Sequence, residues 1–340
     1  MQVSVPSKAR IARNALLTLT LLSCFGCGSF GNAHQRRLTK QLAQLESERG
    51  WHILTYEAEA ISYYENARRS PILLYSGHAN PQSDWIGPAS LSPGGESITF
   101  AEQADAGPFS LVVYDLGKKR REVVLKMPYI FWPRWSPRGD LIAFQCRTID
   151  HGDYSLCTWR IPDKQVSTVL EGLPGGEGSF SWSPNGSEIV YQSTTGGIWI
   201  LDLESKKRTW VDRGFSPTWS PNGRYIAYQH DVGSRWVVND LRTGQKELLL
   251  AGEDVIGNLV WSPDSNYLVY AKLSQGFWDR LTDLRFIAQT YGDLWAMDAE
   301  SKIKVKLYSA GQSIHPTDWG VIHLSDACTQ GAGVVPQRQQ

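Results

Sequence analysis

Short apolar runs separated by turn-forming residues recur along most of the chain. A five-residue phrase centred on Ser-Pro, such as Trp-Ser-Pro-Asn-Gly at 182–186, is followed by a β-type run, such as Glu-Ile-Val-Tyr at 188–191. Pro presets φ for the first corner of a turn, Asn or Asp tolerates the second, and Gly supplies the positive φ that returns the chain. Each phrase therefore predicts the end of one strand and the start of the next.

The phrase recurs at a regular spacing. Its clear copies begin at Leu91, Trp135, Trp182, Trp219 and Trp261, and a degenerate copy begins at Asp318. Each unit of roughly 40–45 residues holds four short β-type runs, which is typical of a β-propeller blade. The Trp before Ser-Pro is expected to pack against the neighbouring blade and to bury on the order of 150–250 Å². The pattern predicts an all-β, six-bladed β-propeller over residues 51–327.

The last unit lacks its outer strands. It has an inner strand near 317–319 and a second strand near 321–324, and the sequence then becomes rich in Gly and Gln, so we expect a flexible tail over 328–340. At the other end of the chain, 60–66 and 71–75 match the third and fourth strands of a blade. We therefore expect strands from both termini to close the ring, which removes the exposed sheet edges of an open arc.

The repeat resembles a known family. Trp-Ser-Pro-Asn-Gly followed by Ile-Ala-Tyr (219–228), together with Ile-Trp-x-x-Asp-Leu (198–203), is similar to the propeller repeat of TolB and to the propellers of prolyl-oligopeptidase-type peptidases. The resemblance covers about 60–327 and implies the fold, with a TolB-like protein-binding role. Too few residues precede the ring for TolB's N-terminal α/β domain, so no site residue is carried over from the family.

The first 23 residues are typical of a secretory signal peptide. Basic residues precede an apolar run over 15–22, which is too short to cross a bilayer as a helix. Leu-Leu-Ser-Cys at 21–24 resembles the bacterial lipobox, which implies that Cys24 is acylated, with palmitate for example. The alternatives are acylation of Cys27 and a cleaved signal without lipid.

Residues 24–50 are then expected to form a short polar, lipid-anchored tether with a short helix near 38–45. Phe rather than Asp at position 25 implies sorting to the outer membrane. We expect the protein to face the periplasm, although the sequence leaves a surface orientation open.

Five cysteines suit an oxidising compartment. Cys146 ends the second strand of its blade and Cys157 lies early in the third, so a hairpin can set the two opposite each other. We expect a disulfide between them if their Cα atoms lie within about 7 Å. The alternative is that both are small packed residues, and the pairing of Cys27 and Cys328 stays open.

Composition and motifs exclude several classes of function. The 34 Lys and Arg residues balance 34 Asp and Glu, which removes the electrostatic case for nucleic acid as a bulk partner. The chain contains no Gly-x-Ser-x-Gly motif, and its seven histidines lack metal-binding spacing. We therefore expect a non-enzyme with no catalytic residue, metal or cofactor. His230 and His315, near strand ends, keep open the alternative of a site in the channel.

Basic residues gather in the turns between third and fourth strands. These turns lie on one face of a propeller, so their charges add up there. The basic face would suit an acidic protein or an anionic lipid surface, whereas the alternative is ordinary solvated hairpin tips. Its main members are Lys118, Lys119, Arg120, Arg121, Lys206, Lys207 and Arg208.

The fifth blade carries an insertion, 272–293, between its second and third strands. Its apolar residues recur at helical spacing and predict a short amphipathic helix that either plugs the channel or docks a partner. These residues are Phe277, Trp278, Leu281, Leu284 and Ile287.

The leading hypothesis is a monomeric, lipid-anchored, non-catalytic scaffold that binds another, unidentified envelope protein. The alternative is a propeller that binds or cleaves carbohydrate or peptide in its central channel. A third hypothesis is a sensor lipoprotein whose insertion moves when a ligand enters.

Overall fold

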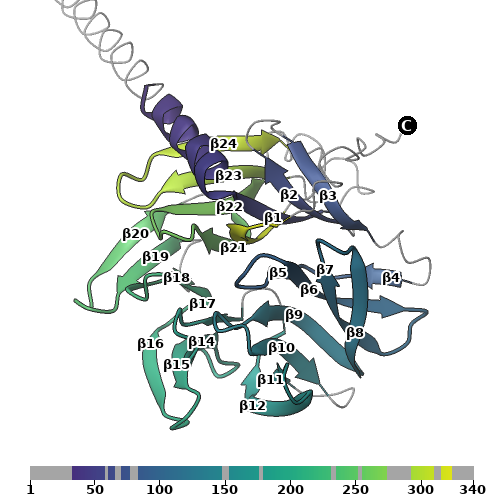
Figure 1. The fold of residues 1–340 in the computed structure, drawn as a ribbon. Helices are drawn as coiled ribbons and strands as arrows, with labels where there is room; N and C mark the ends of the chain where they lie inside the picture. Colours follow the sequence, from purple (N-terminus) through teal and green to yellow (C-terminus); the bar gives the residue numbers. More distant parts are fainter. Residues whose placement is uncertain are drawn as a thin grey trace, which may run out of the picture.

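The computed structural model shows six antiparallel sheets arranged as the blades of a β-propeller (Figure 1). It describes residues 33–57, 60–65, 70–76, 83–147, 153–175, 179–230, 235–251, 255–273, 292–309 and 315–323. Within these ranges no helix is both long and apolar enough to span a membrane. The predicted six-bladed, all-β fold is confirmed.

Five of the blades are built from consecutive strands. Blade 1 contains β4 (Ser83–Ile86), β5 (Ser90–Leu91), β6 (Ser97–Ala104), β7 (Phe109–Asp115) and β8 (Arg120–Met127). Blade 2 contains β9 (Tyr129–Trp135), β10 (Leu141–Arg147), β11 (Tyr154–Arg160) and β12 (Gln165–Leu173). Blade 3 contains β13 (Phe180–Trp182), β14 (Glu188–Gln192), β15 (Ile198–Asp202) and β16 (Arg208–Asp212). Blade 4 contains β17 (Phe215–Trp219), β18 (Tyr225–His230), β19 (Arg235–Asp240) and β20 (Lys246–Leu250). Blade 5 contains β21 (Val255–Trp261), β22 (Tyr267–Leu273), β23 (Gly292–Asp298) and β24 (Lys304–Ser309).

Blade 6 joins the two ends of the chain. Its strand order is β25-β1-β2-β3, in which the inner strand β25 (His315–Val321) pairs with β1 (Trp51–Glu57). The hairpin of β1 and β2 (Ala60–Glu65) then leads to the outer strand β3 (Ser70–Ser76). Strands from both termini therefore close the ring, as predicted.

The second strand of blade 6 differs from the prediction. It is β1, not a strand near 321–324, so the N-terminal side contributes three strands and the C-terminal side one. Residues 51–56 form a β-type run that makes a short hairpin with β2, and its Leu54 is fully buried. This local pairing supplies the second strand, because residues close in sequence pay little loop-closure entropy.

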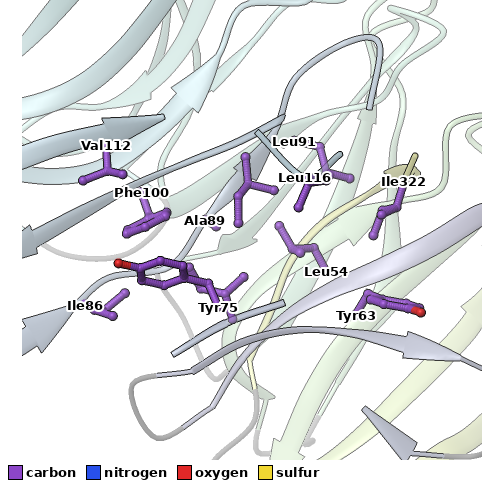
Figure 2. Close-up of a cluster of buried hydrophobic side chains, with 12 residues drawn as sticks. Leu54, Tyr63, Tyr75, Ile86, Ala89, Leu91, Phe100, Val112, Leu116 and Ile322 are labelled. Carbon is purple, nitrogen blue, oxygen red and sulfur yellow. The ribbon is translucent and has the colours of Figure 1, made fainter. Parts of the chain in front are cut away.

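An apolar cluster seals the seam between blade 6 and blade 1 (Figure 2). Leu54 of β1, Leu91 of β5 and Ile322, which follows β25, meet there with Phe100 of β6. Leu54 and Phe100 have no exposed surface. The seam is therefore packed as a continuous core, with side chains from both ends of the chain.

The buried serine of the repeated phrase explains why the phrase recurs. In blade 4 the Ser220 hydroxyl donates to Asn222 Oδ1 at 2.8 Å and accepts the Tyr225 backbone N–H at 2.8 Å. Gly223 completes the turn with a φ of 75°. Equivalent bonds are made by Ser183 in blade 3 and Ser262 in blade 5. The hydroxyl thus satisfies polar groups that the tight turn leaves unpaired.

A helix over residues 33–49 packs against the ring (Figure 1). Its Leu38 and Leu42, each 2% exposed, join a core cluster with side chains of β2, β22, β23, β24 and β25. The helix ends at Gly50, whose positive φ of 62° and N–H bond to the Glu46 carbonyl at 2.9 Å form a C-terminal cap. The tract predicted as a polar tether with a short helix near 38–45 thus contains a longer helix, 33–49, that packs against the ring.

Leu42→Ala is expected to release this helix while the ring stays folded. Truncation of a buried Leu costs about 2–5 kcal/mol, and an isolated helix of this length is marginal in water. Hydrogen exchange should show loss of amide protection in 33–49, with protection in β6 and β10 unchanged. Gln44→Ala, on the exposed side of the helix, is the matched control. Unchanged protection in the Leu42→Ala protein would show that docking does not depend on this contact.

Candidate functional site

The ends of the six inner strands enclose a cavity of about 200 Å³ in the central channel. Blades 2 to 6 each line it with two positions, the Trp of the repeated phrase and the residue just before that Trp, whereas blade 1 contributes only Ser90, the residue before its phrase. The lining residues include Ser90, Arg134, Trp135, Ser181, Trp182, Thr218, Trp219, Val260, Trp261, Asp318 and Trp319. The repeat therefore places the residue before the phrase from every blade around a common axis, with a Trp from five of the six.

The indole N–H groups of the lining tryptophans differ in their partners. Trp182 Nε1 donates to the Arg134 carbonyl at 3.2 Å, and Trp219 Nε1 donates to the Gly223 carbonyl at 3.3 Å. Trp135 Nε1 and Trp261 Nε1 are buried and have no hydrogen-bond acceptor among the described residues. Because these two nitrogen atoms are buried, they do not face the cavity as free donors.

In blades 1, 3 and 6, the side chain just before the first position of the repeated phrase links its blade to the next one. The Asp318 carboxylate of blade 6 accepts the Leu91 N–H at 2.9 Å and the Ser90 hydroxyl at 3.1 Å, both from blade 1. The Ser90 hydroxyl in turn accepts the backbone N–H of Trp135 in blade 2 at 3.3 Å. The Ser181 hydroxyl of blade 3 accepts the backbone N–H of Trp219 in blade 4 at 3.1 Å. The channel lining is thus part of the framework that holds the ring together.

Both charged side chains of the cavity lining, Arg134 and Asp318, are engaged with other blades. The Arg134 guanidinium of blade 2 donates to the Thr317 carbonyl of blade 6. The described part of the lining contains no histidine, because His230 ends the second strand of blade 4, and the side chain of His315 lies outside the described residues. The described residues also contain no group of three or more His, Cys, Asp or Glu suited to a metal.

In an antiparallel blade, the turn after the inner strand and the turn between the third and fourth strands lie on the same side of the ring. We call this side the turn face. The opposite side, which holds the connections between second and third strands, is the loop face. Lys118, Lys119 and Arg120 are exposed on the turn face in blade 1. Lys206, Lys207 and Arg208 are exposed there in blade 3. Six of the seven cations singled out from the sequence therefore project into solvent on one side.

Two acidic residues of the same turns stabilise them by accepting hydrogen bonds from backbone N–H groups. Asp202 Oδ1 accepts the Ser205 N–H at 2.7 Å and the Glu204 N–H at 3.1 Å, and bonds from Ser205 hold the pKa of Asp202 below its usual range. Asp115 accepts the Lys118 N–H at 2.8 Å, which likewise lowers the pKa of Asp115. These carboxylates stay ionised but are directed at backbone donors.

Arg121 is different from the other six basic residues. Its guanidinium turns inward and pairs with the carboxylate of Glu102, which is 2% exposed. Tyr75 of blade 6 donates its hydroxyl to the same carboxylate at 3.5 Å, and burial raises the pKa of Tyr75. Because an unpaired buried carboxylate is costly, Arg121 has a structural role at the seam of blades 1 and 6.

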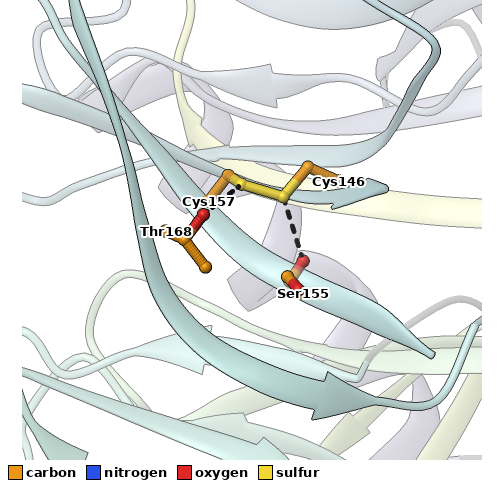
Figure 3. Close-up of a disulfide and its surroundings, with 4 residues drawn as sticks. All are labelled: Cys146, Ser155, Cys157 and Thr168. Atoms are coloured by element: carbon orange, nitrogen blue, oxygen red, sulfur yellow. Dashed lines mark hydrogen bonds between the residues drawn. A yellow bond between two sulfur atoms is a disulfide. The ribbon is translucent and has the colours of Figure 1, made fainter. Parts of the chain in front are cut away.

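A disulfide joins Cys146 of β10 to Cys157 of β11 (Figure 3). The two residues are diagonal neighbours, since Cys146 pairs with Ser155 in the sheet and Phe144 pairs with Cys157. Their Cα atoms lie 5.8 Å apart, and each residue is 2% exposed. The bond ties the second and third strands of blade 2 together at their loop-face ends.

Replacing both cysteines by Ala is expected to lower the free energy of unfolding by roughly 3 kcal/mol, the order expected for a short disulfide loop. Thermal unfolding should show a lower midpoint for the double variant than for the oxidised native protein. Reductant should lower the midpoint of the native protein to that of the variant and leave the variant unchanged. A native midpoint that does not respond to reductant would contradict this expectation.

Several residues singled out from the sequence lie outside the described part of the chain. They are Cys24, Cys27, Cys328, Phe277, Trp278, Leu281, Leu284 and Ile287. Conversely, Arg134 and Asp318 were not predicted from the sequence as channel residues. Both stand just before the Trp of the phrase, and this position could have identified them, but the residue type there differs from blade to blade.

Comparison with solved structures places this fold among TolB-like propellers. TolB from Acinetobacter baumannii superposes with a TM-score of 0.64 at 17% identity, covering 79% of this chain and 66% of that one. A structure assigned as TolB from Agrobacterium tumefaciens gives 0.55 at 14% identity, covering 79% and 92%. A chain of a nidogen/laminin complex gives 0.59 at 10% identity, covering 79% and 98%.

These likenesses establish the fold alone, and they confirm the resemblance of the repeat to the TolB propeller. The match spans 66% of the length of the Acinetobacter protein. A scan against protein-family models gives no match, and neither does a search of curated proteins.

Proposed function

We propose that this protein is a lipid-anchored propeller of the bacterial envelope that binds another envelope protein and does not catalyse a reaction. The observation that carries the proposal is the commitment of the channel's charged groups. Asp318 accepts the Leu91 N–H of blade 1, and Arg134 of blade 2 donates to the Thr317 carbonyl of blade 6, so both groups are committed to contacts between blades. A rigid ring with exposed turns and loops is suited to presenting a surface to a partner.

The similar structures support this proposal by analogy. The repeat resembles that of TolB, solved TolB structures share the fold, and another neighbour in fold comes from a nidogen/laminin complex. The signal-like residues 1–23 and the lipobox-like sequence ending at Cys24 support an envelope location with acylated Cys24, in the outer membrane and facing the periplasm. A monomer on the membrane, without cofactor, is sufficient for such a role.

A second candidate function is binding of a small carbohydrate or peptide in the channel. It is favoured by the tryptophan side chains of blades 2 to 6, which line the cavity. Aromatic faces with a few polar groups are typical of sites for such ligands.

Site-specific photocrosslinking in the intact envelope separates these functions. A photoreactive residue is placed at Thr195 on the loop face, at Lys207 on the turn face, or at Leu248, which is 49% exposed on the outer strand of blade 4. A scaffold should give one discrete protein adduct from one face and none from Leu248. Absence of an adduct from all three positions would reject the scaffold and favour the channel ligand.

A further inference from the structure

The docked helix reaches the ring from the turn face. Trp51, the first residue of β1, pairs with Val321 at the end of β25, and the inner strands of all blades end at the turn face. Residues 33–49 therefore approach blade 6 from the same side as the exposed lysines. In Figure 1 the helix overlies β23 and β24, in agreement with the shared core of Leu42 with Leu294 and Leu307.

The first half of this helix is cationic. Arg36, Arg37 and Lys40 are exposed, and the helix has no acidic residue before Glu46. Only residues 25–32 separate Cys24 from the helix, and a chain of that length reaches at most about 30 Å. A lipid on Cys24 would therefore hold the membrane surface close to these three cations.

The turn face continues this positive surface. Within the described residues, Lys119, Lys206 and Lys207 have no carboxylate within 4.0 Å. Of the nearby carboxylates, Asp115 and Asp202 accept backbone N–H groups of their own turns, whereas Glu122, which pairs with Arg120 at 3.7 Å, and Glu204 are exposed. Lys118, which pairs with Asp115 at 3.2 Å, keeps a side chain 75% exposed. On the loop face, the exposed Asp105, Asp153 and Glu171 offset the exposed Lys126, Arg213 and Arg235.

We propose that the turn face, together with the cationic half of the helix, lies on an anionic phospholipid surface, and that the loop face points away from it. The proposal rests on the acylation of Cys24 proposed above, which brings the surface within reach. Basic side chains near a membrane are attracted to anionic headgroups within a Debye length. The acyl chains hold the N-terminus at the membrane, and a basic patch adds the electrostatic attraction that orients the ring on it.

Amine acylation followed by mass spectrometry tests the orientation. The mature protein is reconstituted into vesicles that contain phosphatidylglycerol, or into vesicles of phosphatidylcholine alone. In phosphatidylglycerol vesicles the reactivity of Lys118, Lys119, Lys206 and Lys207 should fall several-fold, and high salt should restore it. Lys126, exposed on β8 at its loop-face end, should react equally in both preparations.

A matched pair of charge reversals tests which face is responsible. Lys206→Glu with Lys207→Glu should restore the reactivity of Lys118 and Lys119 in phosphatidylglycerol vesicles. Arg213→Glu with Arg235→Glu changes the net charge equally at exposed loop-face positions and should leave the protection intact. Equal reactivity of the turn-face lysines in both types of vesicle would overturn the proposal. Protection of the turn-face lysines in intact envelopes but not in phosphatidylglycerol vesicles would also overturn the proposal. It would indicate that an acidic protein, not the lipid surface, covers the turn face.

If Cys24 is not acylated, mass spectrometry of the mature protein would show this separately, because the mass of the lipid would be missing. The unlipidated chain would then be mixed with the same vesicles. Salt-sensitive cosedimentation with phosphatidylglycerol vesicles alone would still support contact through the turn face, and its absence would reject that contact.

Discussion

Asp318→Ala is expected to lower the free energy of unfolding by about 3 kcal/mol, because the carboxylate is a charged polar link between the inner strands of blades 6 and 1. Its Oδ2 accepts the Leu91 N–H at 2.9 Å and the Ser90 hydroxyl at 3.1 Å. Truncation leaves a donor from the inner strand of blade 1 without its partner. Denaturant unfolding measures the change, and hydrogen exchange in β1 should report the local opening of the seam.

Two further variants separate this effect from a general loss of polarity. Asp318→Asn retains one side-chain oxygen for the Leu91 N–H and should cost roughly half as much. Ser181→Ala removes the equivalent link between blades 3 and 4, where the chain is continuous, and should cost only about 1 kcal/mol. If Asp318→Ala unfolds at the same denaturant concentration as the native protein, the seam does not depend on this carboxylate.

Cys24→Ala is expected to move the protein from the membrane pellet to the soluble envelope fraction. Acyl chains anchor a protein by about 0.8 kcal/mol for each buried methylene, and this variant has lost the residue that carries them. Fractionation should include a high-salt wash, because the basic turn face would retain some unlipidated protein at low salt.

Cys27→Ala is the matched control, since it removes the second candidate for acylation only three residues away. It should leave the protein in the pellet and leave the mass of the attached lipid unchanged. Retention of the Cys24→Ala protein after the salt wash, or release of the Cys27→Ala protein, would show that the lipobox assignment is wrong.

The ring could be predicted from sequence because its signal is local and repeated. The serine of each phrase bonds within five residues of itself, as Ser220 does with Asn222 and Tyr225, so the turn is specified by a few adjacent residues. The second strand of blade 6 was assigned incorrectly because 51–57 lies outside any copy of the phrase. Its partner, β25, is at the other end of the chain.

The channel and the docked helix were harder to predict for a related reason. Leu38 and Leu42 have the spacing of a helix, but the surface that covers them comes from blades 5 and 6. The role of Asp318 depends on Leu91, 227 positions away in the sequence. Arg121 was grouped with exposed lysines because its buried partner, Glu102, lies on a different strand. Such contacts are set by the closed ring, not by neighbouring residues.

The pairing of β1 with β25 in blade 6 also means that the ring closes last, after the whole chain has been synthesised. β1 receives its neighbour β25 only after the rest of the chain has been delivered, because Leu54 and Thr317 are 263 positions apart. Until then the edge of β1 is open to pairing with another chain. Rapid sealing of the ring once β25 is available, or protection of the β1 edge by a chaperone until then, would limit aggregation of this protein.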